Sequence, residues 1–229
     1  MCGRFVLTAD GELIQQQFDL QFTPEGIAAR YNIAPGQPIA VITNSDPANL
    51  TFHRWGLIPS WAKDAKIGNR LINARAETLH EKPSFKNAYK RRRCLIPSNG
   101  FYEWAKHGNA KKPMYIHLKD HALFAFAGLW ETWNSPHGDE ITTCTIITTE
   151  PNDVVKPLHH RMAVILRPEN YKTWLSTEEM LPDSLQPLLQ PYNANRMEAY
   201  EVSRFVNSPA NDTPQCIEAV DSPQQSTLF

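Results

Sequence analysis

The chain has 229 residues, of which 41% are hydrophobic and 21% are charged, and its formal net charge is −1. These values are typical of a globular protein with a sizeable core, and the length suits one large domain or two small ones. No apolar run approaches about 18 residues and no charged-then-apolar leader opens the chain, so we expect no membrane span and a cytoplasmic location. The cysteines lie far apart without a Cys-x-x-Cys pair, so we expect no disulfide framework, no metal site and no cofactor.

The predicted elements, in chain order, are short and mostly strands. A helix is expected over Glu12–Phe18, with Thr8 or Asp10 as its N-cap. Two alternating β-rich segments follow, Ile39–Thr43 and Leu50–Trp55, joined through Asn44–Asn49. A helical turn is expected at 84–90, and further strands are expected at Arg93–Pro97, Met114–Leu118, Leu123–Trp130 and Thr142–Thr149.

Proline positions predict two further helices, Pro168–Leu175 and Pro182–Leu189. Many short strands with a few short helices indicate an α+β fold with a β-rich, barrel-like core flanked by short helices. We expect one domain over residues 1–220 and a flexible tail over residues 221–229, which is polar and contains proline until its last two residues.

Positive charge is concentrated in one stretch of the chain. Between Trp61 and Arg93 there are ten Lys or Arg residues and three Asp or Glu residues, which gives +7, whereas the remainder of the chain carries −8. This uneven distribution favours a polyanionic partner such as nucleic acid. A solvated charged surface without a partner is the alternative interpretation.

A cysteine stands directly after the initiator methionine. If Met1 is removed, Cys2 carries both an α-amine with a pKa of about 7.7–8 and a thiol with a pKa of about 8.5, so both are usable nucleophiles near neutral pH. The amine can form an imine with an aldehyde, and the thiol can then close a five-membered thiazolidine. An internal cysteine cannot do this, because its nitrogen is part of an amide. A buried structural thiol is the alternative.

Two segments contain candidate acid–base groups. Glu103 lies among aromatic residues in SNGFYEW, and such surroundings desolvate a carboxyl group and raise its pKa, as a general acid requires. The pair His159–His160 precedes Arg161, and a histidine beside an arginine can move protons at an anionic substrate. A glutamate on a strand edge and exposed histidines are the alternatives.

Polar and aromatic residues suited to a nucleic acid lie near the basic stretch. Asn73 and Arg75 share one face if the segment is extended, so an amide and a guanidinium point to one place. Trp55 and Trp61 flank a proline turn, where aromatic and cationic residues together can hold unpaired bases. Structural hydrogen bonds for the first pair and a core position for Trp55 are the alternatives.

Six ordered motifs give the chain a specific resemblance. They are MCGRF, RYNIAPGQ, RWGLIPSWAKD, INARAET, RRCLIPSNGFYEW and HHRM, and the resemblance runs from residue 2 to about residue 220. Together they resemble the SRAP family of abasic-site processing proteins. The resemblance implies a single SRAP domain that binds single-stranded DNA and forms a covalent crosslink with the ring-opened aldehyde of an abasic site. It also implies a lyase activity and a peptidase label that is linked to N-terminal processing.

The resemblance also assigns roles to individual residues. Cys2 matches the crosslinking residue, Asn73 the asparagine that positions the opened sugar, and Glu103 the acid that assists imine formation. His159 matches the family histidine, which leaves His160 as the variable position. Arg4 and Arg75 match phosphate-binding arginines of the family, and Arg161, which matches the arginine beside the histidine, is also expected to bind phosphate. Ala163 stands where the family pattern has proline. In all, the expected DNA-binding residues are Arg4, Arg75, Arg161, Trp61, Lys82 and Lys86.

The last five residues, QSTLF, resemble the short peptide that docks on the bacterial replication sliding clamp. Leu228 and Phe229 could fill an apolar pocket while Gln225 hydrogen-bonds to its rim. We therefore expect abasic single-stranded DNA as the partner, the sliding clamp as a second hypothesis, and a monomer without membrane contact.

Two other functions are compatible with the same residues. Glutamine amidotransferase domains also begin Met-Cys-Gly, and Asn99–Gly100 is similar to their oxyanion loop, so Cys2 could be an acyl-transfer nucleophile. A nucleic-acid-binding module with an inert Cys2 is the other. A denaturing gel with abasic single-stranded DNA separates the three.

Overall fold

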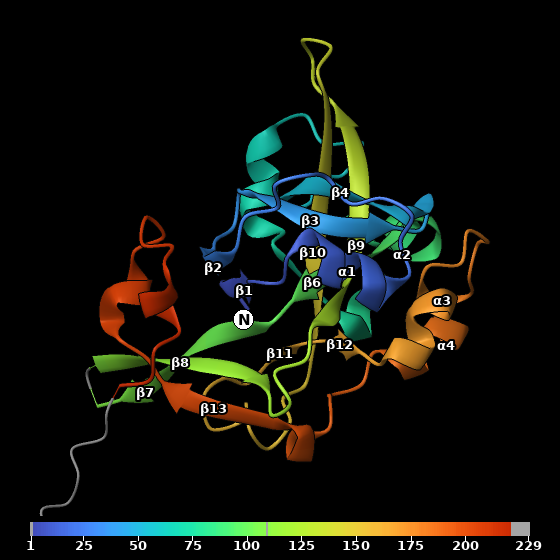
Figure 1. The fold of residues 1–229 in the computed structure, drawn as a ribbon. Helices are drawn as coiled ribbons and strands as arrows, with labels where there is room; N and C mark the ends of the chain where they lie inside the picture. The colour runs from blue at the N-terminus through green and yellow to red at the C-terminus, as the bar shows by residue number, and fades with distance from the viewer. Residues whose placement is uncertain (1, 109, 221–229) are drawn as a thin grey trace, which may run out of the picture.

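A closed β-barrel forms the centre of the molecule (Figure 1). The structure is a computed structural model that describes residues 2–108 and 110–220. In spatial order its strands are β10 (Glu140–Thr149), β4 (Asp46–Trp55), β3 (Pro38–Thr43), β6 (Arg93–Ser98) and β9 (Phe124–Asn134). The barrel closes because β10, the first strand in this order, pairs in parallel with β4 and also antiparallel with β9, the last strand.

A second sheet continues from the barrel. Only Asn99 separates the last residue of β6 from the first residue of β7, so the chain passes directly from one sheet to the other. In spatial order this second sheet contains β13 (Met197–Glu201), β8 (Ala110–Leu118), β7 (Gly100–His107), β1 (Phe5–Leu7) and β2 (Arg30–Ile33). In Figure 1, β7, β8 and β13 lie below the barrel strands and β1 lies between the two groups.

Short elements complete the fold. The helices are α1 (Gly11–Phe18), α2 (Lys86–Arg91), α3 (Tyr171–Trp174) and α4 (Pro182–Leu185). The remaining strands are β5 (Asn73–Arg75), β11 (Met162–Ala163) and β12 (Ile165–Leu166). Among the described residues, no helix has the length and apolar character needed to cross a membrane.

Aromatic side chains join the second sheet to the barrel. Phe5 of β1 packs edge-on against Trp55 of β4, with ring centroids 5.3 Å apart, and against Phe126 of β9 at 5.9 Å. Phe101 of β7 also packs against Phe126. All four side chains are almost completely buried, so the segment that follows Cys2 is anchored in the core. Trp55 is thus a core residue, as its alternative interpretation stated.

The α+β prediction with a barrel-like core is confirmed, and most predicted elements are present with shifted ends. Asp10 caps α1, because its side chain accepts a hydrogen bond from the backbone of Leu13 at 2.8 Å.

The predicted loop over Asn44–Asn49 is wrong in length, since β4 already begins at Asp46. The helix predicted over Pro182–Leu189 changes to a 3₁₀ turn after Leu185, where Pro187 lacks the N–H that an α-helix requires. Tyr171–Trp174 is likewise the only α-helical part of the segment predicted over Pro168–Leu175, because a 3₁₀ turn precedes it. The tail with its clamp hypothesis lies outside the described residues.

Candidate active site

Strand register brings the N-terminal segment to Glu103. Phe5 of β1 pairs antiparallel with Phe101 of β7, and the backbone of Tyr102 donates to the carbonyl of Arg4 at 3.0 Å. In antiparallel strands, the residues before Phe5 must therefore lie beside the residues after Phe101. Cys2 is consequently positioned next to Glu103, and their charges interact.

A second contact joins Cys2 to the barrel. β5 pairs in parallel with β10, with Asn73 opposite Ile146, and the side-chain amide of Asn73 donates to the carbonyl oxygen of Cys2 at 2.9 Å. The other side-chain atom, Oδ1 of Asn73, is buried and has no hydrogen-bond partner among the described residues. A buried acceptor of this kind is costly unless a donor such as a sugar hydroxyl reaches it.

The thiol of Cys2 is fully buried. Burial raises its pKa well above the usual range, and the neighbouring Glu103 carboxylate raises it further. The thiol is therefore protonated at neutral pH and is a poor first nucleophile. A proton acceptor or a nearby positive charge is needed to generate the thiolate.

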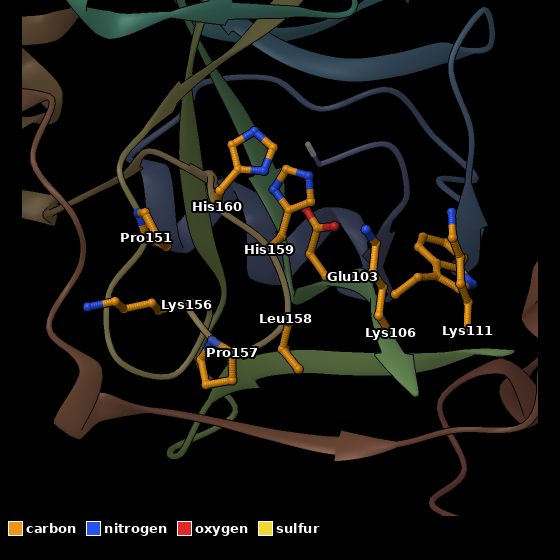
Figure 2. Close-up of a pocket in the computed structure, with 10 residues that line it drawn as sticks. Glu103, Lys106, Lys111, Pro151, Lys156, Pro157, Leu158, His159 and His160 are labelled. Carbon is orange, nitrogen blue, oxygen red and sulfur yellow. The ribbon is translucent and has the colours of Figure 1, made fainter. Parts of the chain in front are cut away.

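Glu103 lies on β7 at the edge of a cleft of about 780 Å³ (Figure 2). Its side chain is only 3% exposed, and burial raises the pKa of its carboxyl group. A larger fraction of this group is protonated near neutral pH than in an ordinary glutamate. The aromatic surroundings predicted from SNGFYEW therefore coincide with the environment that a general acid requires.

His159 enters the same cleft from the segment between β10 and β11. Figure 2 shows its ring directed toward the carboxyl group of Glu103. Burial is the main cause that lowers the pKa of His159, and nearby positive charge lowers it further, so the neutral ring predominates at neutral pH. His160 stacks on His159, with ring centroids 4.3 Å apart, and is exposed.

The backbone of Arg161 can accommodate both protonation states of His159. Its N–H lies 3.0 Å from Nδ1 and its carbonyl oxygen lies 3.1 Å from the same nitrogen. The neutral ring accepts from the N–H, which places the ring proton on Nε2, whereas the imidazolium donates from Nδ1 to the carbonyl. A histidine held in this way can take up and release a proton without moving.

A second hollow, of about 420 Å³, adjoins Asn73. Arg75 and Lys82 also line it, and both are exposed. Lys86 is exposed at the start of α2 and does not line this hollow. The alternation predicted for the INARAET segment is confirmed, because β5 places Asn73 and Arg75 on one face.

The other two arginines expected to bind phosphate already have partners in the protein. Arg4 donates to Oδ1 of Asn32 at 2.7 Å and to the carbonyl of Val206 at 2.9 Å. Arg161 forms a two-pronged contact with Glu77, with nitrogen–oxygen distances of 2.7 and 2.9 Å. A phosphate at Arg161 must therefore compete with a carboxylate.

Trp61 lies apart from these contacts. Its side chain is 57% exposed and lines a hollow of about 320 Å³ together with Lys63, Lys66 and Arg70. A large exposed aromatic beside three cations is suited to stacking with an unpaired base. Its DNA-binding role stays a prediction.

The charge count overestimated the basic surface. Arg93 is completely buried, Arg92 pairs with Glu131 at 3.1 Å, and Arg91 pairs with Glu179 at 2.8 Å. Three of the ten counted cations thus have structural partners. The surface available to a polyanion lies in the earlier part of the stretch.

The cleft also contains cations that the sequence interpretation missed. Lys106 and Lys111 are directly opposite each other in the β7–β8 pairing, and Lys156 lies across the cleft (Figure 2). They stand outside the stretch in which charge was counted. The signal for them was the turn sequence His107–Gly108–Asn109, which predicts a hairpin and hence the pairing.

Asn99 and Gly100 have structural roles in this fold. The side-chain oxygen of Asn99 accepts from the backbone of Thr8 at 2.8 Å and of Ala9 at 3.1 Å. A Cβ at Gly100 would lie 2.5 Å from the ring of Tyr115. Close packing explains the glycine and strand anchoring explains the asparagine, so neither residue supports an oxyanion loop.

The fold and the site define a single-domain α+β protein in which residue 2 lies beside a buried acid and a side-chain amide, and the acid shares a cleft with an imidazole. Residues 1–209 match the family described as SOS response associated peptidase (SRAP). The chain belongs to this family.

Named relatives and a solved structure agree with this membership. The chain is 54% identical over 223 residues to the abasic site processing protein YoqW of Bacillus subtilis, a match that covers 96% of this chain and all of the relative. It is 34% identical over 192 residues to the abasic site processing protein HMCES of Gallus gallus, covering 73% of this chain and 56% of that protein. A crystal structure of a protein from Bacteroides thetaiotaomicron has a TM-score of 0.87 at 29% identity, and covers 96% of this chain and 100% of its own.

Proposed function

We propose that this protein processes abasic sites in single-stranded DNA by forming a covalent bond between Cys2 and the ring-opened sugar. The main support is the convergence of Cys2, Asn73, Glu103 and His159, which come from four separate segments of the chain. The names of the relatives at up to 54% identity support abasic DNA as the substrate.

The first chemical step requires a free α-amine on Cys2. Hydrolysis of the Met1–Cys2 peptide bond consumes one water and releases methionine, which fits the peptidase in the family description. The amine then attacks the C1′ aldehyde carbon, and loss of one water gives an imine. Glu103 is suited to donate the proton that the departing water needs, because burial raises its pKa.

The second step closes the ring. An iminium on the Cys2 nitrogen places a positive charge next to the thiol and offsets the burial that otherwise raises the thiol pKa. The sulfur adds to the former aldehyde carbon, the thiol proton leaves through His159 or Glu103, and the iminium nitrogen becomes the ring amine of a thiazolidine. The order, amine first and thiol second, follows from the protonated state of the buried thiol. The same iminium is the intermediate from which a lyase reaction would start.

Asn73 and the nearby cations are suited to hold the substrate. The unpaired Oδ1 of Asn73 can accept a hydrogen bond from a sugar hydroxyl beside the reacting carbon. Arg75 and Lys82 line the adjoining hollow and can bind the flanking phosphate groups.

The test compares crosslinking by the Cys2→Ser variant with crosslinking by the unmodified chain on a denaturing gel, using an abasic single-stranded oligonucleotide. We expect stable crosslinks to vanish, because an oxazolidine is far less stable than a thiazolidine, while noncovalent binding persists. The matched control is Cys216→Ser, whose hydroxyl can retain the thiol's contact with the carbonyl of Asn211. Undiminished crosslinking by Cys2→Ser would refute the proposal.

Two further variants separate chemistry from binding. Glu103→Gln and His159→Ala are expected to slow crosslinking by about 10²–10⁴-fold, the usual contribution of an acid–base group, without a matching loss of DNA affinity. Mass spectrometry of the purified protein establishes whether Met1 has been removed. Glutaminase activity without crosslinking would instead favour an N-terminal-nucleophile amidohydrolase.

A further inference from the structure

A group of metal-binding side chains lies on the second sheet, away from the cleft. His117 of β8, His121 in the turn after β8 and Glu198 of β13 have potential ligand atoms within 4.8 Å of one another. The β8–β13 pairing sets His117 directly opposite Glu198. None of the three lines the cleft that contains Glu103, so the proposed DNA chemistry does not account for them.

The hydrogen bonding of His117 exposes a lone pair to Glu198. Nδ1 of His117 lies 2.8 Å from the carbonyl oxygen of Leu118, and because a carbonyl can only accept, Nδ1 carries a proton. In the neutral ring, Nε2 then has a free lone pair, which faces the Glu198 carboxylate at 3.5 Å. This backbone contact is the type that fixes the tautomer of histidine ligands in metal sites.

The 3.5 Å separation suits two ligands of one ion. In a tetrahedral zinc site with ligand bonds of about 2.0–2.1 Å, adjacent ligand atoms lie about 3.4 Å apart. The same distance is long for a direct hydrogen bond, for which about 2.7–3.2 Å is usual. A cation between Nε2 and the carboxylate would satisfy both groups.

The surroundings hold the imidazole ring of His117 in place. His117 is only 2% exposed, stacks on Tyr115 with ring centroids 5.2 Å apart, and contacts Tyr200 edge-on at 5.5 Å. His121 also stacks on His117, with ring centroids 4.7 Å apart. His121 has a φ of 53°, a left-handed conformation that favours glycine or asparagine, so a histidine here is retained at some cost in backbone energy.

The turn that contains His121 is also fixed to β13. Asp120 pairs with Arg196 at 3.1 Å, and the backbone of Lys119 donates to the carbonyl of Arg196 at 2.9 Å. Asp120 is thereby engaged, while the exposed side chains of His121 and Glu198 remain able to rotate toward Nε2 of His117. The three ligands come from two segments that an ion would clamp together.

We propose that His117, His121 and Glu198 form a binding site for Zn²⁺, with water in the fourth position. Two imidazoles and one carboxylate are a known ligand set for zinc, whereas Mg²⁺ and Ca²⁺ prefer sites made of oxygen ligands. The site contains no cysteine, so cysteine spacing could not indicate it. Zinc binding stabilises the edge of the second sheet, since an ion that binds only the folded chain shifts the folding equilibrium.

The test titrates Zn²⁺ into the metal-free full-length protein by calorimetry and repeats the titration with Co²⁺, whose absorption reports tetrahedral coordination. We expect one equivalent per chain and a higher Tm with zinc. His121→Asn removes a ligand while favouring the left-handed backbone, and Glu198→Gln keeps the side-chain shape, so we expect both variants to fold. Each is expected to weaken Zn²⁺ binding at least about tenfold.

Two controls locate the ion. His137→Asn removes another exposed turn histidine and is expected to bind zinc as the parent does. Cys2→Ser is also expected to retain one equivalent, which excludes the candidate active site as the location. Equal Zn²⁺ affinity in the parent, His121→Asn and Glu198→Gln, or no binding by the parent, would overturn the proposal.

Discussion

The basic stretch contains two regions with different physical roles, and one arginine from each shows the difference. Arg93 is completely buried, and its five N–H donors meet five backbone carbonyls at 2.5–3.2 Å, from Tyr89, Lys90, Trp174, Ser176 and Glu178. Arg75, which lies 18 positions earlier, is exposed and lines a hollow beside Asn73. One arginine closes the ends of two helices, and the other faces solvent at the candidate site.

The difference shows how a buried cation can replace a capping residue. α2 and α3 end near Arg93, and the last carbonyls of a helix have no partner within it. A planar guanidinium can satisfy several of them at once and also interacts favourably with the negative end of the helix dipole. Burial lowers the pKa of Arg93, but the carbonyls compensate its charge, so no carboxylate is needed.

The largest effect is expected at Arg93. Arg93→Met removes the charge and all five donors and leaves buried carbonyls without partners, so we expect a loss of about 3–5 kcal/mol in the free energy of unfolding. Urea denaturation measures it. Arg93→Lys retains the charge with only three donors, so its free energy of unfolding is expected to lie between those of the parent and Arg93→Met.

DNA affinity is the readout that tests this comparison. If Arg93 is purely structural, the folded fraction of Arg93→Met binds an abasic oligonucleotide as the parent does. A loss of affinity in the folded protein, with little loss of stability, would show that the comparison is wrong.

Arg75 is expected to give the opposite result. Arg75→Ala removes an exposed cation from the hollow beside Asn73, so we expect about tenfold weaker DNA binding, or about 1.4 kcal/mol, and an unchanged free energy of unfolding. Fluorescence anisotropy at several salt concentrations measures both the affinity and a decrease of about 1 in the salt slope. Arg91→Ala, which removes an exposed arginine paired with Glu179, is the matched control and should leave the slope unchanged.

The sequence was sufficient for the local geometry of the site but not for the partners of its charges. Alternation in INARAET predicted the shared face of Asn73 and Arg75, and aromatic neighbours predicted the environment of Glu103, because both depend on residues close in sequence. The Arg161–Glu77 contact joins residues 84 positions apart, and the carbonyls around Arg93 come partly from the segment after α3. Such contacts depend on the packed fold, so a charge count could not separate the two regions.

Removing the charge of Glu77 should convert Arg161 from an arginine that is paired within the protein into one that is available to DNA. Glu77→Gln removes the negative charge beside Arg161 and Arg75, so a phosphate no longer competes with a carboxylate. We expect DNA binding to strengthen about two- to fivefold, which corresponds to less than about 1 kcal/mol. Competition binding with unlabelled oligonucleotide measures it. Weaker binding by Glu77→Gln would mean that the carboxylate positions Arg161 for DNA instead of competing with it.

The smallest expected effect is the pH dependence of this contact. Burial acts to raise the pKa of Glu77, but the hydrogen bonds and charge of Arg161, together with Arg75, outweigh it and lower the pKa. A carboxyl group with a lowered folded-state pKa stabilises the protein above its unfolded pKa, and that contribution is lost as the pH falls through the folded-state pKa.

This pH effect distinguishes a solvated contact from a buried one. Glu77 is half exposed, so solvent screens the pair and we expect a contribution of at most about 1 kcal/mol. The difference in unfolding free energy between the parent and Glu77→Gln should therefore be small at pH 7 and disappear in acid. The contacts of Arg93 involve only carbonyls, which do not titrate, so the difference between the parent and Arg93→Met should stay constant over the same range. A pH-dependent difference for Arg93→Met would instead place a titrating acid beside Arg93.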